Sequence, residues 1–163
     1  MKLVHVVGRK NHGKTTLIVE LLRELTRRDL KVGTIKHSHH LHELDVPGKD
    51  SHRHRTAGAA PSAVVTPELA AVFAPRTAEE DIYERLSSLY VDCDLVLVEG
   101  HIDMPGQKVE VWRQEVSDEC LANQRDDILA VIADGILETS VPVWPRDNVS
   151  RVADEILKLT GHH

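Results

Sequence analysis

The most restrictive feature of this sequence is an eight-residue segment near its start, Gly8–Thr15, which reads GRKNHGKT. It directly follows Leu3–Val7, a β-branched run that is typical of a strand. From Lys14 to Arg28, leucine and isoleucine recur at helical spacing, which predicts an amphipathic helix. A second strand is predicted at Lys31–Ile35. Strand, glycine turn, helix and strand together make a βαβ unit, whose two strands run parallel.

The segment has the G-x-x-x-x-G-K-[ST] spacing of a phosphate-binding loop. Its glycines let successive N–H groups point at phosphate oxygens, and the helix that follows adds its positive N-terminal end. Lys14 would reach the β- and γ-phosphates, and the Thr15 hydroxyl would ligate Mg²⁺. Because a predicted strand and helix flank the match, we interpret it as a site for a purine nucleoside triphosphate rather than a chance match. The expected nucleotide contacts are Gly8, Arg9, Lys10, Asn11, His12, Gly13, Lys14, Thr15 and Thr16.

The remainder of the chain predicts a single α/β domain spanning residues 1–163. Apolar residues make up 41% and aromatic residues only 3%, so the core must be aliphatic, as in parallel sheets covered by helices. We therefore expect a P-loop NTPase-like fold with a mostly parallel sheet flanked by helices. Further strands are predicted at Ser62–Thr66, Leu69–Phe73, Asp94–Val98 and Ile128–Ala133, an edge strand at Lys108–Trp112, and helices at Thr77–Tyr90 and Asn148–Leu159.

Charge and composition exclude several classes of partner. The formal net charge is −6, from 26 acidic and 20 basic residues, which disfavours binding to a nucleic-acid backbone. The longest aliphatic run, Ile128–Ala133, is too short to span a bilayer. The two cysteines, Cys93 and Cys120, form no CxxC pair and are typical of reduced cytosolic thiols. We expect a cytoplasmic protein that binds neither nucleic acid nor membrane.

A carboxylate for magnesium is expected at the end of a strand next to the loop. Glu99 ends the strand-like run DLVLVEG, at the carboxyl end where ligands bind in open α/β sheets. We assign it to the magnesium side, directly or through water. The alternative is a strand-end carboxylate that faces solvent. Asp134, at the end of a late strand, is placed where it could accept hydrogen bonds from a guanine edge.

Residues 37–55 form a polar segment with three possible interpretations. Imidazole suits Zn, Ni and Cu, so the segment could store or deliver a metal. It could instead form an anion or second-substrate site, or it could be a solvated loop without a specific role. The segment lacks cysteine and HExxH spacing, which disfavours a fixed metal site. Its histidines are His37, His39, His40, His42, His52 and His54, and the basic residues of the anion site would be Lys36, Lys49, Arg53 and Arg55.

Several blocks taken together resemble one family, molybdopterin-guanine dinucleotide biosynthesis protein B (MobB). The phosphate loop alone is generic, whereas its combination with the blocks in residues 33–59 is specific. The blocks occur in family order across about the first 113 residues. They are GRKNHGKTTL at Gly8–Leu17, GTIKHSHH at Gly33–His40, DVPGKDS at Asp45–Ser51, HRTAGA at His54–Ala59 and LVLVEG at Leu95–Gly100.

The resemblance implies a GTP- and Mg²⁺-binding adaptor with at most weak GTPase activity. Such a protein would form a homodimer and help a MobA-like guanylyltransferase convert molybdopterin to its guanine dinucleotide. By the same resemblance, Asp50 would join Glu99 and Thr15 on the magnesium side. The resemblance also places Lys36, His37, Lys49 and Arg55 around a neighbouring anionic pocket. The family block usually reads like VEGFK, whereas here His101 and Ile102 replace the aromatic residue and the lysine.

Two functions from other classes stay open. A small-molecule kinase on the same fold would use Asp50 to orient the acceptor and Arg55 over the γ-phosphate, although no lid segment of the expected length is visible. A nucleotide-driven metallochaperone would use the histidines, with His39 and His40 as the first candidates.

Overall fold

The computed structural model describes residues 1–77 and 80–162, and its chain forms two compact units. The first, unit 1, contains residues 1–38 and 87–162, and the second, unit 2, contains residues 39–86. Units defined by contacts do not test whether the chain is one domain, so the single domain over residues 1–163 stays a prediction. No helix among the described residues is long and apolar enough to cross a membrane.

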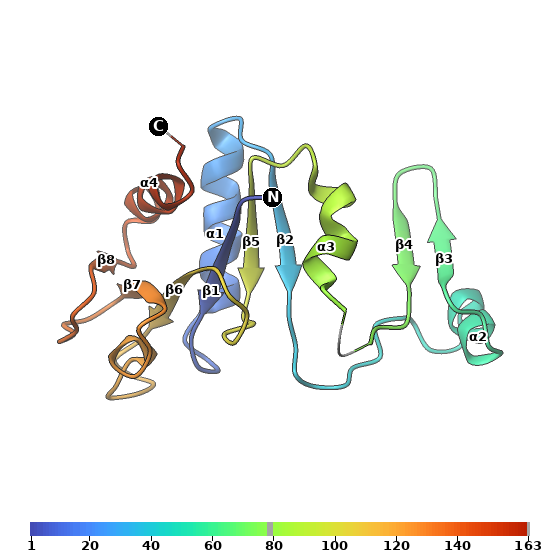
Figure 1. Ribbon diagram of the computed structural model, residues 1–163, viewed down its shortest axis with the longest axis horizontal. Helices are drawn as coiled ribbons and strands as arrows, with labels where there is room; N and C mark the ends of the chain where they lie inside the picture. The colour runs from blue at the N-terminus through green and yellow to red at the C-terminus, as the bar shows by residue number, and fades with distance from the viewer. Residues whose placement is uncertain (78–79, 163) are drawn as a thin grey trace. The chain divides into compact units, whose positions relative to one another are not determined.

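Unit 1 is built on a six-stranded sheet in which every neighbouring pair is parallel (Figure 1). This confirms the predicted α/β, P-loop NTPase-like fold class. The strand order is β2 (Val32–Lys36), β5 (Leu95–Glu99), β1 (Leu3–Val7), β6 (Gln107–Trp112), β7 (Ile128–Ala133) and β8 (Val143–Pro145). The helical elements of unit 1 are α1 (Lys14–Arg27), η1 (Ser87–Tyr90), η2 (Leu121–Asn123) and α4 (Val149–Leu159).

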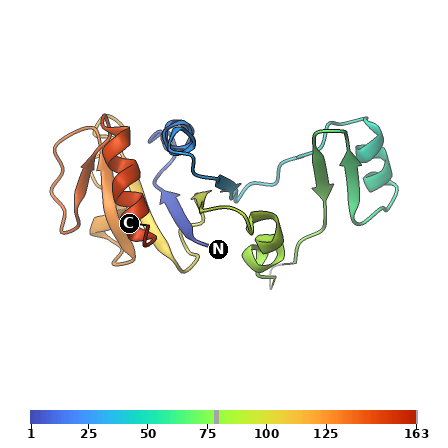
Figure 2. The same ribbon diagram turned by 90° about the horizontal axis from the view of Figure 1, so that it is seen from above.

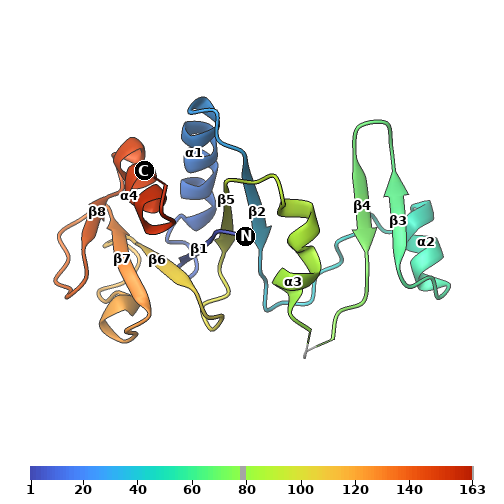
Figure 3. The same cartoon turned by 45° about the horizontal axis from the view of Figure 1, so that its top comes forward.

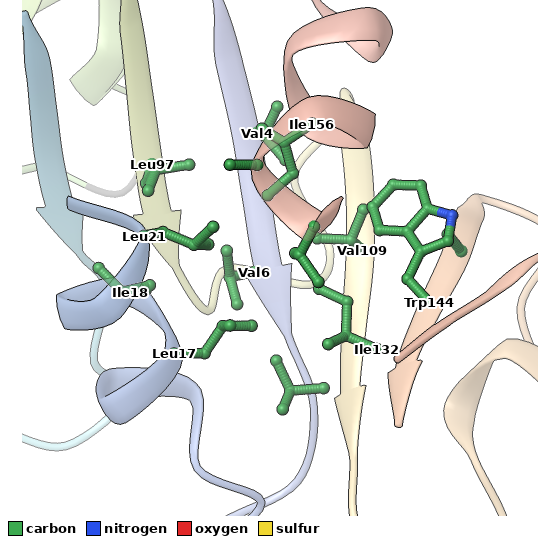
Figure 4. Packing of buried hydrophobic residues seen from close by; sticks show 14 of the residues in the cluster. Val4, Val6, Leu17, Ile18, Leu21, Leu97, Val109, Ile132, Trp144 and Ile156 are labelled. Atoms are coloured by element: carbon green, nitrogen blue, oxygen red, sulfur yellow. The ribbon is translucent and has the colours of Figure 1, made fainter. Parts of the chain in front are cut away.

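Helices α1 and α4 lie side by side and cover one face of this sheet (Figures 1 and 3). Side chains alternate between the faces of a strand, so every second residue of each strand meets these helices. Leu17 and Leu21 of α1 and Ile156 of α4 are fully buried against Val6 and Leu97 of the strands (Figure 4). The aliphatic core expected from the composition therefore lies between α1, α4 and the sheet.

The opposite face of the sheet carries a smaller apolar cluster and several buried polar residues. Trp112 and Val131 pack there with residues of the segment that contains η2. Glu110 is 1% exposed and accepts hydrogen bonds from the backbone N–H groups of Leu121 and Ala122, at 2.8 and 2.9 Å. Burial raises the pKa of Glu110, opposed by these two N–H donors. A buried carboxylate thus anchors the η2 segment to β6.

The strand predicted at Lys108–Trp112 begins one residue earlier, at Gln107, and its predicted place at the edge of the sheet is wrong. It is β6, which pairs with β1 on one side and β7 on the other, so it is not an edge strand. The sheet edge on that side is β8, which the sequence did not reveal. Because both edges of β6 are already paired, this strand has no open edge with which a second chain could pair.

Helix predictions near the middle of the chain were also inexact. The helix predicted at Thr77–Tyr90 is reduced to α3 (Ile82–Leu86) followed by η1, and its residues 78–79 lie outside the described residues. In the segment predicted as a loop, α2 (Asp50–Thr56) forms a short helix. The helix predicted at Asn148–Leu159 is confirmed, and its N-cap Asn148 accepts a hydrogen bond from Arg151 N at 3.0 Å.

Unit 2 contains an antiparallel hairpin of β3 (Ser62–Val65) and β4 (Ala70–Phe73), with α2 packed beside β3 (Figure 2). The turn between the two strands is closed by a hydrogen bond from Thr66 N to Leu69 O at 2.8 Å.

Candidate functional site

The loop between β1 and α1 has the curled backbone that the motif predicts. Gly8, Asn11 and Gly13 all have positive φ, at 136°, 69° and 84°. At Gly8 an added Cβ would lie 2.5 Å from the carbonyl oxygen of Val111, so the loop can pass β6 only with glycine there. The positive φ values of Gly8 and Gly13 explain why glycine is required at these two positions of the motif.

The N-terminus of α1 forms the inner wall of the loop. Gly13 is its N-cap and has no side chain to cap it, and the first turn holds no acidic residue. The first N–H groups of any helix lack intrahelical partners. In α1 the first intrahelical hydrogen bond runs from Leu17 N to Gly13 O at 2.9 Å. These amides and the helix dipole make this end of α1 a site suited to an anion.

Lys14 folds back over the loop. Its Nζ donates to the carbonyl oxygen of Arg9 at 2.7 Å. Burial lowers the pKa of Lys14, the nearby Glu99 carboxylate opposes that shift, and the charge of Lys36 adds to it. A partly desolvated ammonium gains more from an anionic ligand than a fully hydrated one, because less water must be removed.

Glu99 meets the loop at the carboxyl end of β5. Its Oε1 accepts hydrogen bonds from Thr15 Oγ1 at 2.8 Å and from Lys36 Nζ at 3.1 Å. Parallel pairing brings Lys36 at the end of β2 into register with Glu99. The structure therefore brings together Thr15 and Glu99, the pair predicted for magnesium, and their hard oxygen atoms are ligands that Mg²⁺ prefers.

A cavity of about 450 Å³ joins these groups. Arg113 also lines it, a residue that no motif in the sequence pointed to. Arg113 directly follows the predicted strand Lys108–Trp112, at the end of the sheet where ligands bind. Because that strand was expected at the edge of the sheet, Arg113 was not expected near the loop. The lining residues are Lys10, Asn11, Gly13, Lys14, Thr15, Thr16, Glu99 and Arg113.

His12 anchors the loop to the segment that follows β6. It is 1% exposed, its Nδ1 accepts a hydrogen bond from Arg113 N at 2.9 Å, and its Nε2 lies 3.4 Å from Ser117 Oγ. A backbone N–H can only donate, so Nδ1 carries no proton. Burial, with the charges of Lys14, Arg9 and Arg113 also contributing, lowers the pKa of His12. Any phosphate contact by His12 would therefore come from its backbone.

Asp134 follows β7, where the sequence placed it, and is already engaged. Its Oδ2 accepts from Arg113 Nε at 2.8 Å, and its Oδ1 from Gln114 N at 3.4 Å. Its predicted contact with guanine stays a prediction.

His37 lies beside Glu99 at the end of β2. Its backbone N–H donates to Glu99 O at 3.0 Å, and its ring stacks on that of His101 with centroids 3.8 Å apart and planes inclined by 2°. His101 thus supplies a flat ring where the family pattern has an aromatic residue.

The remaining predicted site residues belong to unit 2. Lys49 is the N-cap of α2 and Asp50 its first residue, with Asp50 Oδ1 3.8 Å from Arg53. Arg55 pairs with Glu43 and lies over the ring of Phe73, 5.8 Å from its centroid. The role of Asp50 beside Glu99, and that of Lys49 and Arg55 beside Lys36, stay predictions. Among the described residues, no three His, Cys, Asp or Glu side chains are grouped so that they could hold a metal ion.

The fold and the loop together define the class of protein. A parallel sheet, a glycine turn after β1, a helix N-terminus facing a cavity and a strand-end carboxylate beside Thr15 place the chain among P-loop NTPase-like α/β proteins. More narrowly, it belongs to the MobB family, because the model for molybdopterin guanine dinucleotide synthesis protein B matches residues 3–134.

Comparisons with individual proteins agree with this assignment. The chain is similar to the molybdopterin-guanine dinucleotide biosynthesis adapter protein of Haemophilus influenzae, with 33% identity over 162 residues, 98% of this chain and 90% of that protein. The adapter protein of Escherichia coli is 31% identical over 152 residues, 90% of this chain and 86% of its own. Among solved structures, Bacillus subtilis MobB superposes with a TM-score of 0.74 at 26% identity over the whole of both chains. A MobB homolog from Bacillus stearothermophilus gives 0.71 at 28% identity, covering 97% and 99%.

Proposed function

We propose that this chain binds GTP together with Mg²⁺ at Gly8–Thr15 and serves as an adapter in molybdopterin-guanine dinucleotide biosynthesis. The observation that carries the binding proposal is the 2.8 Å hydrogen bond between Thr15 and Glu99 beside Lys14, at the mouth of a helix N-terminus. The names of the relatives support the adapter role.

Each group at the site would have a definite part in binding. The amides of the loop and of the first turn of α1 would hold phosphate oxygens. Lys14 would leave the Arg9 carbonyl for the β- and γ-phosphates, at the cost of one hydrogen bond. Thr15 and Glu99 would hold Mg²⁺, which would supply positive charge against the phosphate oxygens. Lys36, which donates to Glu99 Oε1 at 3.1 Å, would be placed to contact an anionic group beside the site.

Hydrolysis by this site should be slow, which favours an adapter over an enzyme. Fast phosphoryl transfer needs a residue that orients the attacking group. Glu99 is the one carboxylate among the described residues that line the cavity, and its Oε1 already accepts from Thr15 and Lys36. We extend the proposal to a homodimer that delivers GTP or molybdopterin to a MobA-like guanylyltransferase.

Calorimetric titration of GTP with and without Mg²⁺ tests the binding proposal. Loss of a charged lysine that contacts two phosphates should weaken binding about 100-fold in the Lys14→Ala variant, since each charge-assisted hydrogen bond contributes about 1.5 kcal/mol or more. The matched control is Lys31→Ala, an exposed lysine of unit 1 that hydrogen-bonds to Asp94 through its backbone N–H and C=O. Equal GTP affinity in both variants, with normal circular dichroism, would refute the site.

A second experiment tests the adapter role. Guanine dinucleotide formation by a MobA-like guanylyltransferase is measured with and without the chain, and then with the Lys14→Ala variant. We expect stimulation by the native chain and little by the variant. Rapid multiple-turnover phosphorylation of a small molecule by the chain alone would instead identify a kinase.

A further inference from the structure

A second cavity of about 360 Å³ lies at the end of the sheet where the phosphate loop lies. It is formed by the segments that follow β6 and β7, and Figure 1 shows these segments and the loop after β1 at the same end of the strands. Its volume is within the range of small-molecule sites, about 300–1,000 Å³. The residues that line it are Trp112, Gln114, Asp118, Asn123, Ile136, Leu137 and Glu138.

Trp112 lies in the wall of this cavity and carries a buried hydrogen-bond donor. The residue is 1% exposed, and its indole Nε1 is buried without a hydrogen bond to any part of the chain that the structure describes. An indole N–H can only donate, and a buried donor without an acceptor is unfavourable. This donor therefore indicates a ligand that presents an acceptor atom.

The rim of the cavity supplies acceptors, and its wall is apolar. Asp118 and Glu138 contribute carboxylates, while Ile136 and Leu137 offer surface for a flat ring. Asn123 Nδ2 donates to the backbone carbonyl of Glu138 at 3.1 Å, which holds the two segments together.

One donor and two carboxylates complement the edge of guanine. Guanine presents the O6 acceptor beside the N1–H and 2-amino donors, whereas adenine has an amino donor in place of O6 and lacks the 2-amino group. The same set of protein groups would oppose adenine, because the indole donor would face the adenine amino group.

The cavity is joined to the phosphate loop by one short segment. Arg113 lines the phosphate cavity, and its neighbours Trp112 and Gln114 line the second one. His12 of the loop holds this segment at Arg113 N and at Ser117 Oγ. Strands in a sheet are about 4.8 Å apart, so the ends of β6 and β7 lie about 5–10 Å from the end of β1, a gap that a ribose can bridge.

We propose that this cavity is the guanine subsite of the nucleotide site, with Trp112 as donor and Asp118 and Glu138 as acceptors. The assignment rests on the proposed GTP binding and moves base recognition away from Asp134, whose two carboxylate oxygens already accept from Arg113 and Gln114.

The test is calorimetric titration of Mg²⁺ complexes of GTP, ATP, XTP and inorganic tripolyphosphate. The native chain should bind GTP at least about tenfold more tightly than ATP. Removing a charged acceptor in Asp118→Asn or Glu138→Gln should weaken GTP binding about 10- to 100-fold and leave tripolyphosphate binding unchanged. One of the two carboxylates would accept from the guanine 2-amino group. The amide variant at that position should also improve XTP binding, because xanthine carries an oxygen atom in place of the 2-amino group.

Two further variants complete the design. Trp112→Phe keeps a large apolar ring but removes the donor, and it should weaken GTP binding without affecting tripolyphosphate. The matched control is Glu119→Gln, next to Asp118 but outside the cavity lining, which should bind GTP like the native chain. Asp118 and Glu119 are both exposed, so neither change should disturb folding.

The outcomes separate the two proposals. If the native chain binds neither GTP nor tripolyphosphate, the proposed function fails. If it binds GTP, but Asp118→Asn, Glu138→Gln and Trp112→Phe all keep GTP affinity within about twofold, the guanine subsite is refuted while the phosphate site stands. Loss of GTP selectivity in Asp134→Asn alone would equally refute the subsite.

Discussion

Substitution of Gly8 by alanine tests the geometry on which the phosphate loop depends. The residue has φ of 136°, and an added Cβ would lie 2.5 Å from the Val111 carbonyl oxygen, where ordinary contact begins at 3.4 Å. The obstacle is backbone in the middle of the sheet, because Val111 belongs to β6, which pairs with both β1 and β7. Accommodation would require β1 and β6 to separate by almost an ångström.

The expected loss of stability follows from two costs. An unfavourable positive φ costs about 1–3 kcal/mol, and forcing extra volume into a packed region costs about 1–3 kcal/mol. Together they give about 2–6 kcal/mol, a large part of the 5–15 kcal/mol that usually separates folded from unfolded chains. For a chain of this size the melting temperature should fall by about 4–24 °C.

Urea unfolding followed by tryptophan fluorescence measures this loss. Trp112 and Trp144 are both buried in unit 1, so their emission reports on the unit that contains the loop. The control is Gly161→Ala, where φ is 70° and nothing lies within 4 Å of the added Cβ, so only the backbone cost of about 1 kcal/mol applies. A loss in Gly8→Ala no larger than that in Gly161→Ala would refute the reasoning.

Three other predictions follow from individual contacts. His12 has a lowered pKa, so the unfolded chain takes up a proton first as pH falls below about 6.5. The urea concentration at the unfolding midpoint should therefore decrease as the pH is lowered from 7.5 to 5.5, and it should decrease less in His12→Gln. An equal decrease in both proteins would contradict this. Loss of the N-cap in Asn148→Ala should cost about 1 kcal/mol in the same assay, and a neutral result would mean that the cap adds nothing. Glu99→Gln should abolish the gain in GTP affinity from Mg²⁺ while metal-free binding persists; a full Mg²⁺ effect would exclude Glu99 as a ligand.

The phosphate loop and the strand-end carboxylate of the site were predictable from the sequence. Gly8–Thr15 sits between a strand and a helix because glycine spacing and hydrophobic period are local signals. Glu99 could be found because the last residue of an aliphatic strand lies at the ligand-binding end of a parallel sheet.

The part of the site contributed by β6 could not be predicted. Whether a strand is central or at an edge depends on which strands pair with it, and the pairing of β6 with β1 joins residues about a hundred positions apart. Missing that pairing concealed Arg113 in the phosphate cavity, and Trp112 beside the second one. Similarly, His12 is buried against Arg113 and Ser117, about a hundred residues further along the chain, and no pattern in the sequence near His12 predicts this.

The sequence by itself determined the phosphate loop, the α/β class and the family, because each follows from short-range spacing of glycine, lysine and aliphatic residues. Only the tertiary structure decided the strand order, the presence of Arg113 at the phosphate cavity and the division into two compact units. The physical reason is that these three features depend on contacts between segments far apart in the sequence. The free energy of such contacts depends on the packing of the whole core, so no single segment of the chain determines it.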